Sequence, residues 1–181
     1  MTNTVSLNIS GLKILQPIIY SDFRGYFFES YNLETLKKVG IEDVFVQDNQ
    51  SCSKKSVIRG LHFQVPPFAQ AKLVRVIKGA ALDVAVDIRK ESATYGQHFS
   101  ALLSEENHLQ FYIPVGFAHG FAALEDNTLF AYKCSNFYHK DYERSILFND
   151  KDLNINWNIE NPIVNDKDLQ AIPFKDFISP F

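Results

Sequence analysis

The polar side chains that could do chemistry are concentrated in two segments with apolar surroundings. The first reads Arg59-Gly-Leu-His62-Phe-Gln64 and is followed by Gln70-Ala-Lys72, and the second, residues 114–121, contains His119. A neutral histidine accepts a proton at physiological pH, and a lysine ammonium stabilises the negative oxygen of an enolate. These residue types therefore suit removal of a proton from a carbon next to a carbonyl, which begins an epimerisation.

A tyrosine on the far side of the substrate would return the proton, and two tyrosines could do so. Tyr132 lies in residues 128–134, which we expect to form a strand, and Tyr138 follows six residues later. The sequence by itself does not choose between them. For each histidine, a hydrogen bond that only supports the core is the alternative to a catalytic role.

A metal site is the other function that histidines in a jelly roll suggest. Such sites combine a His-x-His pair, a carboxylate a few residues later and a distant histidine. Here His62 is followed by Gln64, residues 65–73 contain no Asp or Glu, and Lys72 would add a positive charge. His62 and His119 alone are too few donors for iron or zinc, so we expect no metal.

Alternating apolar residues predict the strands that must position these side chains. We expect a hairpin of residues 73–77 and 82–88 around a tight turn at Lys78-Gly79, with the second strand half-buried. Further strands are expected at residues 99–103, 110–113, 128–134 and 144–148.

The two histidines are expected in different settings. On its strand His62 shares a face with Gln64, whereas Leu61 and Phe63 point to the other side. His119 follows a Pro-x-Gly turn and is expected at the mouth of a strand rather than in a core.

The pattern of elements predicts an all-β fold. Asn32 can cap one short helix over residues 33–39, and Gly40 stands where that helix would end. From Asn149 onward the sequence is typical of loops and short helix packed on a barrel. Many short strands without βαβ alternation predict an antiparallel sandwich or jelly roll, in one domain over residues 1–181.

Composition and charge argue against several classes of function. The chain has 18 Lys and Arg against 21 Asp and Glu, a formal charge of −3, and we expect no nucleic-acid binding. It shows neither a signal-peptide pattern nor an apolar run long enough for a membrane span. Cys52 and Cys134 lack the spacing of a zinc or redox motif, so we expect free thiols and a cytoplasmic protein.

Several motifs together resemble the dTDP-4-dehydrorhamnose 3,5-epimerase family, and the resemblance covers nearly the whole chain. They are Asp22-Phe-Arg-Gly-Tyr-Phe-Phe-Glu29, Gln47-Asp-Asn49, residues 59–64, Gln70-Ala-Lys-Leu-Val74, residues 83–89, residues 114–121, Tyr132-Lys-Cys134, Glu143 and Lys167-Asp168. The resemblance implies a metal-free, cupin-type jelly roll that works as a cytoplasmic homodimer without a cofactor. It also implies an isomerase that inverts C3 and C5 of dTDP-4-dehydro-6-deoxy-D-glucose to give dTDP-4-dehydro-β-L-rhamnose, for dTDP-L-rhamnose and cell-surface polysaccharide synthesis.

The resemblance assigns roles to individual residues. It implies that His62 accepts the proton with Asp168 as its partner in a dyad, that Tyr132 donates a proton and that Lys72 lies beside the ketone. It implies substrate contacts for Arg24, Glu29, Gln47, Asn49, Arg59, His119, Glu143 and Lys167, with Arg24 and Glu29 reaching the site of the second subunit. Tyr138 is a further candidate, for stacking on the base or sugar, and a packing role for it is equally open.

Some alternatives stay open at this point. Asn165-Asp166 and Asn156 depart from the residues more usual in the family, which affects local loop shape. Related enzymes invert C3 alone or act on other nucleotide sugars, and no residue here separates those outcomes. A non-catalytic sugar-binding jelly roll and a metal-dependent jelly-roll enzyme are more distant alternatives, disfavoured because His62, Lys72, Tyr132 and Asp168 are all present.

Overall fold

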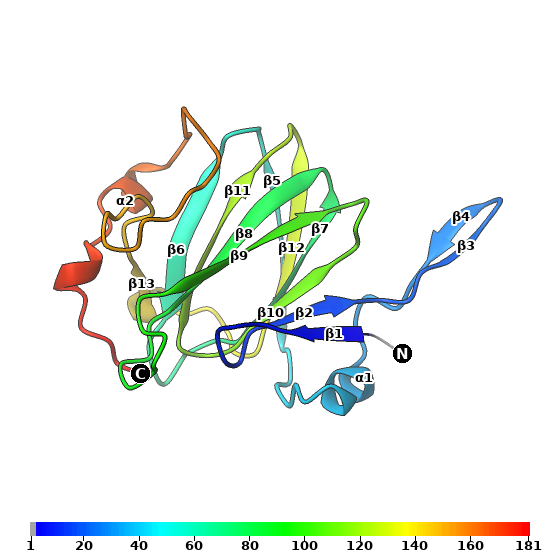
Figure 1. Ribbon diagram of the computed structural model, residues 1–181, viewed down its shortest axis with the longest axis horizontal. Helices are drawn as coiled ribbons and strands as arrows, with labels where there is room; N and C mark the ends of the chain where they lie inside the picture. Colours follow the sequence, from blue (N-terminus) through cyan, green and yellow to red (C-terminus); the bar gives the residue numbers. More distant parts are fainter. Residues whose placement is uncertain (1–2) are drawn as a thin grey trace.

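The computed structural model describes residues 3–181, and two antiparallel β-sheets make up most of it (Figure 1). The six-stranded sheet contains, in spatial order, β1 (Asn3–Ser6), β2 (Lys13–Gln16), β10 (Gln110–Ile113), β7 (Lys72–Lys78), β12 (Thr128–Cys134) and β5 (Gln47–Ser53). The five-stranded sheet contains β13 (Glu143–Ser145), β6 (Ile58–Gln64), β11 (Phe117–Ala123), β8 (Ala80–Asp87) and β9 (His98–Ser104). Side chains of both sheets share one core, as predicted for a jelly roll.

The main core lies between the two sheets. Val74 and Phe130 of the six-stranded sheet meet Ala85 and Phe121 of the five-stranded sheet. The rings of Phe121 and Phe130 are stacked with their centroids 4.0 Å apart. Burial of one such ring stabilises the fold by about 1.5–3 kcal/mol. Both rings also line a cavity that contains the candidate catalytic residues, so the core forms one wall of it.

The predicted hairpin at Gly79 is wrong, although both of its strands exist. β7 pairs with β10 and β12, whereas β8 pairs with β11 and β9 in the opposite sheet. Gly79 has a φ of +78°, and a Cβ there would lie 2.7 Å from Thr128 Oγ1. The chain therefore passes from one layer to the other at this glycine. A glycine turn between two apolar strands has the same sequence pattern in either case.

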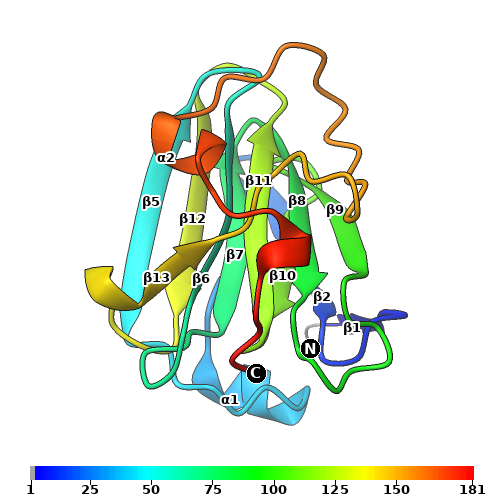
Figure 2. The same ribbon diagram turned by 90° about the vertical axis from the view of Figure 1, so that its left-hand side faces the viewer.

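The prediction that residues 82–88 form a half-buried strand is also wrong. Every residue of β8 is buried. The alternation is real, but its outer side chains, including Val84 and Val86, pack against Leu153 and Trp157 of the C-terminal segment. Figure 2 shows this segment, coloured orange to red, in front of the strands. The expectation that residues after 149 pack on the barrel is thus confirmed.

The other predicted strands agree with the structure to different degrees. Residues 99–103, 110–113 and 128–134 correspond to β9, β10 and β12. In residues 144–148 only the start forms a strand, β13, because the chain then leaves the edge of the sheet. β5 was not predicted, since its sequence, QDNQSCS, is polar on both faces.

The short helices lie outside the sheets. They are α1 (Leu33–Lys38), η1 (Lys140–Tyr142), α2 (Asp166–Leu169) and η2 (Phe174–Asp176). The predicted cap of α1 is confirmed, because the Asn32 side chain accepts hydrogen bonds from the amides of Glu34 and Thr35. Gly40 follows the helix with a φ of +74°, also as predicted.

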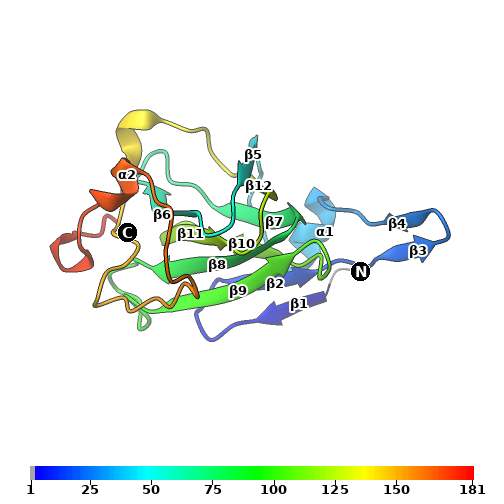
Figure 3. The same cartoon turned by 90° about the horizontal axis from the view of Figure 1, so that it is seen from above.

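A hairpin of β3 (Tyr20–Asp22) and β4 (Gly25–Phe27) forms an arm. Figures 1 and 3 show the arm projecting beyond the sheets, at the end of the molecule opposite α2. Four large side chains of the arm are exposed: Tyr20, Phe23, Tyr26 and Phe27. Exposed aromatic residues that cluster in this way mark a surface that contacts another molecule.

Candidate active site

A buried carboxylate and a histidine meet beside the main cavity. His62 Nε2 lies 2.6 Å from Asp168 Oδ1, and the amide of Gly60 donates a 3.1 Å hydrogen bond to Asp168 Oδ2. The α2 cap residue Asn165 accepts a 2.7 Å hydrogen bond from the Asp168 amide. Burial would raise the pKa of Asp168, but the hydrogen bond and charge of His62 outweigh burial and hold that pKa below its ordinary value. Asp168 is therefore an ionised partner for His62.

A glycine makes this arrangement possible. Gly60 has a φ of +140°, and a Cβ on it would lie 2.5 Å from Gly120 Cα of the neighbouring strand β11. Only glycine allows β6 and β11 to approach so closely. Two residues further along β6, His62 points to the inner side together with Gln64, while Leu61 and Phe63 join the outer core, as predicted.

The candidate base and acid lie on opposite walls of a cavity of about 210 Å³. His62 comes from β6 in the five-stranded sheet, and Tyr132 comes from β12 in the six-stranded sheet. Burial raises the pKa of Tyr132, so its hydroxyl holds a proton that it can donate. Tyr138, the alternative donor, is half-exposed and does not line this cavity. The structure therefore favours Tyr132.

Lys72 belongs to a second buried polar group. Its Nζ lies 3.5 Å from His119 Nδ1, and His119 Nε2 lies 2.9 Å from Asp83 Oδ2. Burial lowers the pKa of both Lys72 and His119. A neutral His119 that donates Nε2–H to Asp83 leaves Nδ1 as an acceptor toward Lys72. Lys72 Nζ also lies 3.4 Å from the His62 carbonyl, so two residues of the five-stranded sheet hold the end of this side chain, which comes from β7 in the other sheet.

Two details of this group differ from the sequence-based expectations. His119 lies inside β11 and is 6% exposed, so the predicted position at a strand mouth is wrong. The Pro-x-Gly turn ends one residue before β11 begins, and the strand carries His119 inward. Asp83 was not proposed as a site residue. Its signal was a carboxylate in the middle of a strand whose other residues, apart from Asp87 at its end, are apolar.

A smaller cavity of about 100 Å³ adjoins the first and shares His62, Lys72 and Tyr132 with it. Its other polar lining residues are Gln47, Asn49, Gln64, Gln70, Tyr138 and Glu143. Glu143 accepts a 2.9 Å hydrogen bond from the Tyr138 hydroxyl and pairs with Lys167 at 2.5 Å. Burial opposes ionisation of Glu143, but Lys167 and Tyr138 lower its pKa overall.

The structure gathers most of the predicted residues and separates two of them. Arg59 lines the main cavity, and its Nε donates to Ser53 Oγ at 3.1 Å. Arg24 lies on the arm, with its side chain 76% exposed and paired with Asp22. Glu29 accepts hydrogen bonds from Asn32 and Thr35 beside α1. Neither Arg24 nor Glu29 lines the two cavities that contain His62 in its own chain.

Comparisons with known proteins decide the family. Residues 6–176 match the family model described as dTDP-4-dehydrorhamnose 3,5-epimerase. The chain belongs to this family. A dTDP-4-dehydrorhamnose 3,5-epimerase from Shigella flexneri is 48% identical over 175 residues, which cover 96% of this chain and 97% of the relative.

Solved structures of the epimerase family confirm the cupin-type jelly roll. A dTDP-6-deoxy-D-glucose-3,5-epimerase, RmlC from Legionella pneumophila in complex with dTDP-4-keto-L-rhamnose, superposes with a TM-score of 0.95. It is 45% identical, and the match covers 98% of this chain and 95% of that one. ChmJ, a 3'-monoepimerase from Streptomyces bikiniensis in complex with dTDP-quinovose, superposes with a TM-score of 0.89. It is 32% identical, and the match covers 93% of this chain and 86% of ChmJ.

Two features are absent from residues 3–181. No group of three or more His, Cys, Asp and Glu side chains in that range is arranged to hold a metal ion. None of the helices described there is long and apolar enough to cross a bilayer.

Proposed function

We propose that this epimerase-family chain inverts C3 and C5 of dTDP-4-dehydro-6-deoxy-D-glucose and forms dTDP-4-dehydro-β-L-rhamnose. The observation that carries the proposal is the placement of His62, backed by Asp168, and Tyr132 in opposite walls of one cavity. A sugar ring between them exposes one face to a base and the other to an acid. Inversion of a carbon requires proton removal and return on opposite faces.

The proposed reaction uses side chains alone. With Nε2–H held by Asp168, His62 Nδ1 takes the proton from C3, and the electrons of the C–H bond move to the C4 oxygen. Lys72 stabilises the resulting enolate. Tyr132 then returns a proton to the opposite face of C3, and proton exchange with solvent resets Tyr132 and His62. C5 also flanks the C4 ketone. Removal of its proton therefore places the negative charge on the same C4 oxygen beside Lys72, and the same residues can invert C5.

The smaller cavity suits the nucleotide part of the substrate. Glu143 in its lining pairs with Lys167, whose positive charge suits a diphosphate together with that of Arg59 from the adjoining main cavity. Tyr138 offers a half-exposed ring for stacking on the base. The amides of Gln47 and Asn49 suit hydroxyls and base edges, and Glu143 adds to the polar lining. His119 lies in the main cavity beside Lys72, where it can contact the sugar. His62, Lys72 and Tyr132, which both cavities share, then face the reacting carbons of the sugar, and the nucleotide extends from there into the smaller cavity.

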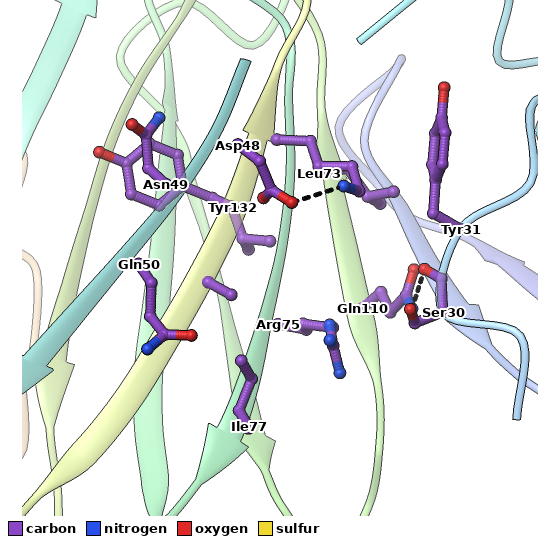
Figure 4. Close-up of a pocket in the computed structure, with 13 residues that line it drawn as sticks. Ser30, Tyr31, Asp48, Asn49, Gln50, Leu73, Arg75, Ile77, Gln110 and Tyr132 are labelled. Carbon is purple, nitrogen blue, oxygen red and sulfur yellow. Dashed lines mark hydrogen bonds and ion pairs between the residues drawn. The ribbon is translucent and has the colours of Figure 1, made fainter. Parts of the chain in front are cut away.

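We further propose that the arm of one subunit completes the site of a second copy. The outer face of the six-stranded sheet is hollowed by a cavity of about 390 Å³, and Figure 4 shows Leu73, Arg75 and Ile77 of β7 on this face. β5, whose inner side chains line the substrate cavities, is one of the two edge strands of this sheet. An arm with four exposed aromatic residues can lie on that face and bring Arg24 and Glu29 across the β5 edge.

Product analysis in D₂O tests the proposed reaction. We expect purified protein to convert dTDP-4-dehydro-6-deoxy-D-glucose, with deuterium appearing at both C3 and C5 by NMR. Label at C3 alone would reduce the function to that of a monoepimerase, the activity named for ChmJ. Binding of the nucleotide sugar without any carbon exchange would overturn the catalytic role. We place the reaction in the cytoplasm, which is consistent with two free cysteines.

A further inference from the structure

One hydroxyl in the main cavity has no hydrogen-bond partner. Ser51 Oγ is buried, and no atom of the described residues 3–181 lies within hydrogen-bond reach of it in suitable geometry. Ser51 lines the same cavity as His62, Lys72 and Tyr132. A hydroxyl that lines a cavity and makes no hydrogen bond to the protein keeps its donor and its acceptor available for a ligand.

The other inward side chains of β5 show that Ser51 is exceptional. Gln47 donates to Asn49 Oδ1 at 3.0 Å, Asn49 contacts Cys134 Sγ at 3.7 Å, and Ser53 Oγ accepts from Arg59 at 3.1 Å. Each of these side chains has a contact within the protein. Among the inward-facing side chains of β5, only the Ser51 hydroxyl makes no hydrogen bond within residues 3–181.

The position of Ser51 indicates which part of a ligand it would meet. It lies opposite Phe130 in the β5–β12 pairing, beside the stacked pair of Phe121 and Phe130. It is absent from the lining of the smaller cavity, which holds Tyr138 and Glu143. If the nucleotide occupies the smaller cavity, as in the proposed function on which this inference rests, Ser51 faces the sugar.

We propose that Ser51 Oγ hydrogen-bonds the C2 hydroxyl of the sugar and makes that hydroxyl a determinant of specificity. The C3 hydroxyl changes position when C3 is inverted, whereas C2 keeps its configuration. A hydroxyl on a rigid strand can therefore hold the C2 group through both inversions. Sugars without this hydroxyl offer Ser51 no hydrogen-bond partner and bind less tightly.

A substrate-deletion cycle tests this inference. We would measure by calorimetry the binding of dTDP-D-glucose and dTDP-2-deoxy-D-glucose, which lack the ketone and do not react. Ser51→Ala should weaken binding of dTDP-D-glucose about 3- to 10-fold and leave binding of dTDP-2-deoxy-D-glucose unchanged. Equal effects on both sugars would overturn the proposal. Ser100→Ala, at an exposed serine of β9, is the matched control and should change neither.

The melting temperature of Ser51→Ala shows whether weaker binding comes from the lost hydroxyl or from a damaged fold. Because Ser51 Oγ makes no hydrogen bond to residues 3–181, Ser51→Ala removes no such contact and should keep or raise the melting temperature, and a clear decrease would contradict the proposal. Turnover of the 4-keto sugar by the unmodified protein reports on the proposed function. The binding cycle needs no turnover, so either proposal can fail while the other stands.

Discussion

His62 Nε2 and Asp168 Oδ1 lie 2.6 Å apart, although 106 positions separate the two residues in the chain. The contact joins an inner strand of the sandwich to a helix of the C-terminal segment that covers its outside. Asp168 is completely buried and has the Gly60 amide as a second partner. The C-terminal segment is thus part of the catalytic apparatus that we propose, in addition to its role in packing.

The His62–Asp168 contact leads to a test of non-additivity. His62→Ala should lower kcat at least about 100-fold, because the base is lost. Asp168→Asn should also lower kcat, since it acts through His62. The double variant should be no slower than His62→Ala, as expected for residues that work as a unit. His98→Ala, at a histidine outside both cavities, controls for general effects, and additive losses would show that Asp168 acts independently.

Tyr132→Phe should separate proton removal from proton return. His62 remains in this variant, so it can still exchange the substrate proton with solvent from its own side. We expect deuterium at C3 with retained configuration and epimerisation reduced about 100-fold or more. NMR of substrate recovered from D₂O measures both quantities. Full inversion in Tyr132→Phe, or loss of exchange together with inversion, would assign the acid to another group.

Mixed dimers test whether Arg24 acts across the subunit interface. Arg24→Ala and His62→Ala should each be nearly inactive alone. In a purified heterodimer of the two, one site combines an intact His62 with an intact Arg24 from the other subunit. We expect about half of the wild-type activity from the heterodimer. Activity no greater than that of the two parents would place Arg24 in the site of its own chain.

A buried carboxylate outside the active site predicts acid sensitivity. Burial would raise the pKa of Asp87, but hydrogen bonds from Arg89, Ser92 and Thr94 lower it to about 2 from 3.8. Because the folded-state pKa is the lower one, this stabilisation is present above about pH 4 and is lost as the pH falls toward about 2.

Asp87→Asn should therefore lower the free energy of unfolding at pH 7 by about 2 kcal/mol. Urea unfolding should show this difference shrinking between pH 5 and about pH 2.5. The exposed Asp152 supplies the control variant, Asp152→Asn, which should change stability little. A difference that is independent of pH would mean that packing, and not charge, accounts for the effect.

Much of the fold could be predicted from alternation of apolar residues. β10 and β12 were predicted with their observed bounds, and α1 begins and ends at the expected cap and glycine. The pairing of β7 with β8 was not predictable, because a turn within one sheet and a crossing between two sheets use the same local pattern. β5 could not be predicted in this way because its inward side chains are polar and serve the cavity.

The sequence by itself determined the residue types of the site, the strands that carry them and the family to which their motifs point. Only the tertiary structure decided that Tyr132 lines the main cavity whereas Tyr138 does not, that His119 lies within a strand beside Asp83, and that Ser51 Oγ has no hydrogen-bond partner among residues 3–181. Local patterns report which side of a strand a residue occupies. Contacts between the two sheets, and between a strand and a distant helix, depend on how the whole chain closes around its core.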